Sequence, residues 1–507
     1  MKVRLLHPDH DTALQRRLPP ALTMMVEDDL ELRTLYNAMA GGDEFVRDIA
    51  AQVVPAGLRD PAVITYRQQV LADCLANPAP VRQMYAIAAD GAEVRRKTFL
   101  GAMLFRDPEA ILRRSVRILE LLVGNLKQLR AVCDRHTADF DSAGLRQFLA
   151  MIAEQLSDDY LARLDDELAE LHLPRGLLLS ARLGLGNKGR RHILHRAAKL
   201  SWWERLTGNA HNGFGFTVDE HDQAGAEALT ALGGRAINDV ANTVTQSADH
   251  VEDFFARLRM ELAFYLGCLN LHAPLTESNV ATCFPTPTPI GAHRFSCRGL
   301  CDVGLCLTTT RRVIGNDLEA DNRSLIMVTG ANEGGKSTFL RSVGAAQMMM
   351  QAGMFVTAES FLADVSNGIL THFKREEDAT LTRGKLDEEL ARMSNIVDYI
   401  GLNSLVLCNE SFASTNEREG SQIARTVIDA FTDAGIKVVF VTHLYDLAHS
   451  LHARQNPGYL FLRAQRRDDG VRTFRLIEAE PHPTSHGEDS FRRVFGVAAA
   501  AAQTAGS

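Results

Sequence analysis

The first 280 residues of the chain carry apolar side chains at steps of three and four residues. One such stripe occupies residues 112–129, a second occupies 149–171 and a third occupies 251–269. This spacing places the apolar side chains on one face of an α-helix, so it predicts long amphipathic helices that pack together. A helical core accounts for nearly all of these residues, and the stripes by themselves predict no chemistry.

A second pattern begins after a proline-rich stretch. Pro285, Pro287 and Pro289 alternate with other residues, and neither a helix nor a central strand can continue through such a stretch. Beyond it, short runs rich in β-branched residues are separated by helical segments, which is typical of a mostly parallel sheet covered by helices. These runs lie at residues 324–329, 404–409 and 437–442.

The segment after the first run satisfies the phosphate-binding pattern GxxxxGK[ST], and a helix-like segment follows it. Glycines allow the backbone to approach phosphates closely, and the N–H groups at the start of the helix face them. Lys336 can reach the β- and γ-phosphates, and Ser337 can hold Mg²⁺. The expected nucleotide-binding residues here are Gly330, Ala331, Asn332, Glu333, Gly334, Gly335, Lys336, Ser337 and Thr338.

The ends of the other two runs carry further candidates. The second run ends in Asn409 and Glu410, where ATPases with such a loop place an acidic residue that orients Mg²⁺. Asn409 keeps an oxygen without the charge, so we expect it to assist Ser337 at the metal with weaker affinity. Glu410 can polarise the attacking water, and His443, at the end of the third run, can sense the γ-phosphate. The expected catalytic residues are Glu410, Lys336 and His443.

Composition leaves the partner of the protein open. A formal net charge of −8 over 507 residues provides no general attraction to nucleic acid, so such binding would need a local basic patch. No stretch is apolar for the roughly 18 residues that a membrane span requires, and the first residues lack the apolar centre of a signal peptide. We therefore expect a cytoplasmic protein with no membrane segment.

The best candidate for a basic patch lies in residues 181–206. Its basic residues can neutralise phosphates, and the Trp202-Trp203 pair can stack or wedge, which would give salt-sensitive binding with little sequence preference. Two other interpretations stay open: an amphipathic helix with a solvated basic face and buried tryptophans, and a helix on a membrane surface. The expected DNA-contacting residues are Lys188, Arg190, Arg191, Arg196 and Lys199.

The order of the nucleotide motifs resembles the ATPase domain of the MutS DNA mismatch-repair family. TGANEGGKSTFLRSVGAAQMMMQAGMFVTA resembles that family's TGPNMGGKST segment and its helix, and SLVLCNESFASTNEREGSQIA resembles SLVLMDExGRGTSxxDGxxxA. VFVTHLYDLA is similar to the ATHYxEL segment. VIGNDL, at residues 313–318, resembles the family's nucleotide-binding stretch, with Asn316 retained. A weaker similarity at residues 64–85 resembles the start of the family's helical core.

Several features depart from the family's pattern. Val313 stands where the family stacks an aromatic side chain on adenine, and Asn409 replaces an aspartate. Gly384 falls where a serine would reach the γ-phosphate in a partner subunit, so that contact is expected to be weaker or to come from Thr382 or Lys385. About 60 residues precede the core, too few for separate mismatch-recognition and connector domains, which indicates a short form of the family.

The resemblance implies an α-helical core and lever region followed by an α/β P-loop ATPase domain with a mostly parallel sheet. It also implies a homodimer that pairs through the ATPase domains and uses ATP and Mg²⁺, with Ser414, Thr415 and Asn416 at the junction. We expect an ATP hydrolase of the MutS type that couples ATP binding and hydrolysis to the binding of mismatched, branched or otherwise structured DNA in repair or recombination.

The expected organisation has four segments, and two other functional classes stay open. One is a nucleotide-gated protein-interaction module with slow or no hydrolysis, which Asn409 and Gly384 favour. The other is a transporter-type or chromosome-organising ATPase, against which the lack of an LSGGQ-like stretch argues. The segments are an N-terminal segment at 1–60, a clamp-like helical core and lever domain at 61–284, the P-loop ATPase domain at 285–497 and a disordered tail at 498–507.

Overall fold

The computed structural model describes most of the chain and divides it into two compact units. The helical unit consists of Met1–Arg4, Asn77–Asp141 and Leu145–Leu262, and the α/β unit consists of Leu5–Ala76, Ser142–Gly144 and Ala263–Ser507. The expected tail at 498–507 lies outside the described residues. Those residues are 1–10, 18–98, 108–174, 176–183, 189–195, 217–219, 221–330, 334–375, 384–466 and 472–482.

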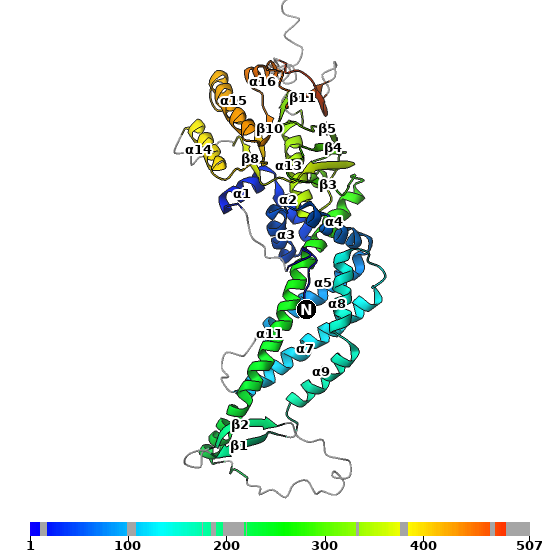
Figure 1. Ribbon diagram of the computed structural model, residues 1–507, viewed down its shortest axis with the longest axis vertical. Helices are drawn as coiled ribbons and strands as arrows, with labels where there is room; N and C mark the ends of the chain where they lie inside the picture. The colour runs from blue at the N-terminus through cyan, green and yellow to red at the C-terminus, as the bar shows by residue number, and fades with distance from the viewer. Residues whose placement is uncertain are drawn as a thin grey trace, which may run out of the picture. The chain divides into compact units, whose positions relative to one another are not determined.

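The first half of the chain is helical, as the apolar stripes predict (Figure 1). The stripe at 112–129 is buried in α7 through Leu112, Val116, Leu119, Leu122, Leu126 and Leu129. The second stripe is interrupted, because α8 ends at Gln155 and Ser157 caps the start of α9, which resets the helical phase. Leu161 is therefore buried, whereas Tyr160 is 43% exposed. The helices from residue 78 onward in this part of the chain are α5 (Pro78–Ala92), α6 (Val94–Thr98), α7 (Pro108–Arg135), α8 (Ala143–Gln155), α9 (Asp158–Leu171) and α11 (Gln223–Glu277).

The larger sheet of the α/β unit has the strand order β12-β11-β6-β10-β9-β8 in the described residues. All neighbouring strands are parallel except β11 and β12. The three β-branched runs form β6, β9 and β10, and β6 is buried along its whole length because helices cover both faces of the sheet. The strands are β6 (Leu325–Thr329), β8 (Ile369–Phe373), β9 (Leu405–Asn409), β10 (Lys437–Val441), β11 (Tyr459–Arg466) and β12 (Arg472–Glu478).

Helices pack on both faces of this sheet (Figure 1). On one face, apolar residues of α1, α14, α15 and α16 form a continuous core with β6, β8, β9 and β10. α13 covers the other face, and Gly344 allows it to approach Leu407 of β9, since a Cβ there would lie 2.5 Å from the Leu407 side chain. These helices are α1 (Pro20–Asp29), α13 (Lys336–Ala352), α14 (Lys385–Val397), α15 (Glu417–Asp433) and α16 (Tyr445–His452).

The proline-rich stretch contributes an edge strand to a second sheet. β3 (Thr286–Thr288) carries one of the prolines and pairs only with β7 among the described strands, which is the position where proline is tolerated. The order of this sheet is β3-β7-β4-β5. Its other strands are β4 (Phe295–Leu300), β5 (Asn316–Glu319) and β7 (Ser360–Asp364).

Helices from the beginning of the chain belong to the α/β unit. Leu22 and Met25 of α1 are buried in the core of the larger sheet, a packing that no motif or periodicity predicts. The expected domain boundaries at residues 60 and 284 stay a prediction. In the described part of the chain, no helix combines the length and apolarity needed to cross a membrane. The remaining helices are α2 (Leu32–Ala40), α3 (Glu44–Ala56), α4 (Pro61–Ala76) and α12 (Val303–Thr308).

Candidate functional site

The three predicted nucleotide motifs meet at one edge of the larger sheet. β6, β10 and β9 are adjacent and parallel, and the register pairs Val328 with Val441 and Val441 with Asn409. The residues that follow these strands therefore emerge side by side at the carboxyl edge of the sheet, where ligands bind in such folds. Gly330, Glu410 and His443 are all placed there.

Two glycines shape the loop between β6 and α13. Gly330 has a φ of +120°, and a Cβ there would lie 2.9 Å from the Cβ of Ala464 on β11. Gly335 has a φ of +86° and precedes α13 as its N-cap, without a side chain that could bond the first N–H groups of the helix. Those N–H groups are a suitable site for an anion. Ala331, Asn332 and Glu333 lie outside the described residues.

Lys336 and Ser337 begin α13 and turn toward the other motifs. Lys336 is only 5% exposed, and its Nζ donates a hydrogen bond to the backbone oxygen of Gly330 at 2.8 Å. Burial lowers the pKa of Lys336, and the nearby carboxylate of Glu410 partly opposes this effect. The hydroxyl of Ser337 donates to the amide oxygen of Asn409 at 2.9 Å. The two residues expected at the metal are therefore in direct contact.

Glu410 is held in a conformation that non-glycine residues rarely adopt. Its φ is +52°, and its N–H donates to the backbone oxygen of Val441 at 2.9 Å. Nδ1 of His443 lies 3.8 Å from Oε1 of Glu410. The imidazole lowers the pKa of Glu410, burial opposes this effect, and Lys336 acts in the same direction as the imidazole. Glu410 is therefore a carboxylate at neutral pH, as a base requires.

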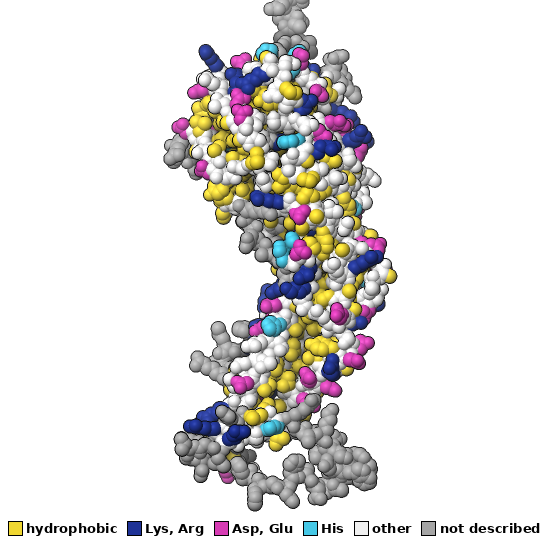
Figure 2. All heavy atoms as spheres, in the orientation of Figure 1, with side chains coloured by type: hydrophobic (Ala, Val, Ile, Leu, Met, Phe, Trp, Pro, Cys, Tyr) yellow, Lys and Arg dark blue, Asp and Glu magenta, His cyan; other side chains and the backbone are white. Residues whose placement is uncertain are grey.

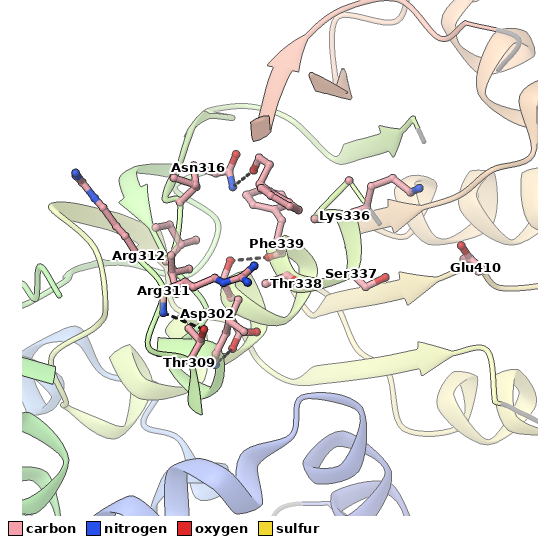
Figure 3. Close-up of a pocket in the computed structure, with 18 residues that line it drawn as sticks. Asp302, Thr309, Arg311, Arg312, Asn316, Lys336, Ser337, Thr338, Phe339 and Glu410 are labelled. Carbon is pink, nitrogen blue, oxygen red and sulfur yellow. Dashed lines mark hydrogen bonds between the residues drawn. The ribbon is translucent and has the colours of Figure 1, made fainter. Parts of the chain in front are cut away.

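A pocket of about 520 Å³ opens beside these residues (Figure 3). Gly334, Lys336, Ser337 and Thr338 form one part of it together with Glu410. Figure 3 shows Arg311 and Arg312 on the opposite side from Lys336 and Glu410. The lining also includes a group of apolar residues, which consists of Leu300, Leu305, Val313, Ile314 and Phe474.

Phe474 is a pocket residue that sequence reasoning did not identify. It lies on β12, outside all of the nucleotide motifs, and its ring is available because the residue is 48% exposed. Val313 also lines the pocket, at the position where the resemblance places an aromatic side chain. The only sequence signal for Phe474 is an isolated aromatic residue in a strand-like segment, and that signal is not specific.

Asn316 is placed next to the pocket and bonded to β12. The N–H of Leu476 donates to the amide oxygen of Asn316 at 2.7 Å, and Nδ2 of Asn316 donates to the backbone oxygen of Phe474 at 3.3 Å. Asn316 therefore holds β12 against β5 and fixes the position of Phe474. A direct contact of Asn316 with nucleotide stays a prediction.

The residues expected at a subunit junction have partners within the chain. Asn416 caps α15 by accepting a hydrogen bond from the N–H of Glu419 at 3.0 Å, and the hydroxyl of Ser414 donates to Glu389 at 3.1 Å. Thr415 also donates to Glu419. Gly384 precedes α14 as its N-cap, and Lys385 begins that helix in an exposed position. Thr382 lies outside the described residues.

The basic segment contains an antiparallel hairpin in the helical unit. β1 (Leu178–Leu183) pairs with β2 (Gly189–His195), so the interpretation of this part as a helix is wrong. The pairing sets Arg182 opposite Arg190, both are exposed, and Figure 2 shows Lys and Arg side chains gathered there. Like charges that face each other across strands destabilise the pair unless an anion compensates them.

Only part of the expected DNA-contacting set is described. Arg190 lies on β2 with an exposed side chain, and Arg191 follows it on the same strand. The Trp202-Trp203 pair lies outside the described residues. The same holds for Lys188, Arg196 and Lys199.

Comparison with known proteins matches both parts of the chain. The MutS2 N-terminal domain matches residues 59–278, and MutS domain V matches residues 326–501. The chain belongs to the MutS family. This finding confirms the resemblance, and the MutS domain V match includes all three nucleotide motifs.

Several curated MutS proteins are similar to part of the chain. The DNA mismatch repair protein MutS of Thermotoga petrophila is 34% identical over 139 residues, which are 27% of this chain and 18% of that protein. The DNA mismatch repair protein MutS of Streptococcus pneumoniae is 27% identical over 169 residues, 33% of this chain and 20% of that protein. The chain thus spans about a fifth of the length of these MutS relatives.

Proposed function

We propose that the protein is a MutS-type ATP hydrolase with a P-loop ATPase domain, which uses ATP and Mg²⁺ to control its binding to DNA. The observation that carries this proposal is the hydrogen bond between Ser337 and Asn409, at a pocket that Lys336 and Glu410 also line. A hydroxyl, an amide oxygen and a carboxylate are the hard oxygen donors that Mg²⁺ prefers. An ammonium and the start of a helix supply the positive charge that phosphates require.

Each side chain then has a separate task. Lys336 exchanges its bond with Gly330 for one with the phosphates, which also compensates its burial. Ser337 and Asn409 offer oxygen atoms to the metal or its water shell. Glu410 accepts the proton of the attacking water. His443 keeps the carboxylate of Glu410 ionised and near the γ-phosphate. When bound, Mg²⁺–ATP supplies the metal charge and the phosphoanhydride bond that is hydrolysed.

The apolar part of the pocket would hold the base. Phe474 offers an aromatic ring where Val313 cannot, so it would take over the stacking of adenine. Asn316 supports this task by holding β12 in place.

The family supports a homodimer that pairs through the ATPase domains, and the hairpin of the helical unit supports contact with DNA. Arg182 and Arg190, which face each other on this hairpin, would neutralise phosphates, and this would give affinity without sequence preference. We therefore propose structured DNA, whether mismatched or branched, as the ligand, in a repair or recombination process.

A panel of duplex, mispaired and branched DNA, measured by fluorescence anisotropy with and without ATP at two salt concentrations, tests the DNA part. The double variant Arg182→Glu, Arg190→Glu should bind more weakly and show a salt dependence lower by about 1 per arginine. The matched control is the double variant Arg113→Glu, Arg117→Glu, which makes the same change in net charge at two exposed arginines of α7. Equal DNA affinity of the two double variants, or no effect of ATP on the affinity for any DNA, would overturn the proposed binding of DNA.

A second function follows from the amide at position 409. Without a charge beside the metal, the protein could bind nucleotide and a partner protein while hydrolysing ATP slowly or not at all. Single-turnover hydrolysis distinguishes the two functions. A rate that Glu410→Gln lowers by about 100-fold or more supports the hydrolase, and equal rates favour the interaction module.

A further inference from the structure

A group of buried polar side chains lies directly behind Glu410. Ser411 follows Glu410 in the chain and is fully buried, as is His372 on β8. Nδ1 of His372 lies 2.7 Å from the hydroxyl of Ser411, and Nε2 lies 3.0 Å from the backbone oxygen of Glu389 on α14. These contacts connect β8, the chain after β9, and α14.

The partners of His372 determine where its proton lies. Burial lowers the pKa of His372 to about 4, so the ring is neutral at physiological pH and carries one N–H. The backbone oxygen of Glu389 can only accept, so this N–H is on Nε2. Nδ1 is then an acceptor. The hydroxyl of Ser411 lies 2.7 Å from Nδ1 and 2.7 Å from the backbone oxygen of His372, so its one hydrogen is shared between two acceptors of the same residue. Each ring nitrogen has one partner, and the orientation of the ring is fixed.

The backbone around Ser411 needs such an anchor. Glu410 and Phe412, on either side of it, have φ values of +52° and +62°. Such conformations are unfavourable for residues other than glycine and persist only where their surroundings hold them. β10 holds the N–H of Glu410, and His372 holds the side chain of Ser411 and stacks on Phe412 with ring centroids 5.4 Å apart.

α14 holds the same region at two further points. Nη1 of Arg392 donates to the backbone oxygen of Phe373 at 2.8 Å, and Phe373 pairs with Asn409 in the sheet. The carboxylate of Glu389 accepts a hydrogen bond from Ser414 at 3.1 Å. A displacement of α14 would therefore act on β8 and on the chain that follows Glu410 at the same time.

We propose that His372 and Ser411 are positioning residues for Glu410, through which α14 sets the place of its carboxylate. This inference rests on the proposed function, because it gives Glu410 a task in hydrolysis. Neither His372 nor Ser411 lines the pocket. The network therefore acts on the rate of hydrolysis and leaves the affinity for nucleotide unchanged.

The test compares two serine variants. Ser411→Ala removes the anchor, and Ser421→Ala is its matched control, since Ser421 on α15 is 2% exposed and its hydroxyl has no hydrogen-bond partner among the described residues. Ser411→Ala should lower the single-turnover rate by about 10- to 100-fold, with Mg²⁺–ATP affinity within about twofold of wild type. Ser421→Ala should have the hydrolysis rate and the Mg²⁺–ATP affinity of wild type. Ser411→Thr should retain most of the wild-type rate. Arg392→Gln should lower the rate without changing affinity.

Equal rates for Ser411→Ala and Ser421→Ala would overturn the inference, and so would a parallel loss of rate and affinity. Hydrogen exchange separates this failure from a failure of the proposed function. If wild type shows no hydrolysis that depends on Lys336, the proposed function fails. Ser411→Ala must still speed amide exchange at Glu410 and Phe412 relative to Ser421→Ala, and unchanged exchange there would overturn the positioning role by itself.

Discussion

The hydroxyl of Ser337 donates a hydrogen bond to the amide oxygen of Asn409 at 2.9 Å. The amide supplies an acceptor beside the metal position but no negative charge. Asn409→Asp should therefore lower the Mg²⁺ concentration needed for ATP binding by about 5- to 10-fold, because a charged acceptor makes hydrogen bonds about twice as strong. A Mg²⁺ titration of ATP binding measures this, with Asn409→Ala as the control that should require more Mg²⁺ than wild type. An unchanged requirement in Asn409→Asp would place the metal elsewhere.

Stability should depend on pH through Lys336. Burial lowers the pKa of Lys336 below its ordinary value of 10.5, so above the folded pKa the unfolded chain binds more protons than the folded chain. Stability then rises with pH in that window. The Tm of Lys336→Met, relative to wild type without nucleotide, should therefore fall as the pH rises toward 10.5. A Tm difference that stays constant or rises over this pH range would contradict the assignment.

His443 should extend hydrolysis to lower pH. It is the main group that lowers the pKa of Glu410, which burial alone would raise above the ordinary value of 4.5. In His443→Ala the acid limb of the single-turnover rate should shift to higher pH, because the carboxylate is the active form. The rate loss should be larger at about pH 5 than at about pH 8. An equal loss at both pH values would exclude this role of the imidazole.

Phe474 should determine the affinity for the base and not for the phosphates. Phe474→Ala should raise the Kd for ATP by about 5- to 150-fold, since stacking of a base on an aromatic ring contributes about 1–3 kcal/mol. Inorganic triphosphate should bind with equal affinity to Phe474→Ala and wild type, and Phe474→Trp should keep the wild-type affinity for ATP. Phe284→Ala, which removes another exposed phenylalanine of the α/β unit, is the control. Equal loss of ATP and inorganic triphosphate affinity would contradict a stacking role.

The sequence contained enough information to predict that three motifs meet at one edge of the larger sheet. The β-branched runs formed β6, β9 and β10, and the carboxyl ends of adjacent parallel strands bring Ser337, Asn409 and Glu410 together. This meeting was predictable because each motif is local and its strand context is fixed by the fold, whereas the roles of these residues in binding and catalysis stay a prediction.

Other features depend on contacts between distant segments, which no local pattern encodes. Phe474 reaches the pocket because Asn316, 158 positions earlier, bonds the backbone of β12. The anchor of Ser411 comes from His372, 39 positions earlier, and either residue alone is an ordinary buried polar side chain. The basic segment was ambiguous for another reason: Arg182 and Arg190 fit a solvated helix or a hairpin equally well in composition.

The most direct test of the central claim is calorimetric titration of the full chain with ATP in the presence of Mg²⁺, for wild type and Lys336→Ala. Wild type should bind one nucleotide per chain, and Lys336→Ala should bind at least about tenfold more weakly, because it removes the ammonium at the phosphates. No measurable binding by wild type, or equal affinity in the two proteins, would contradict the account.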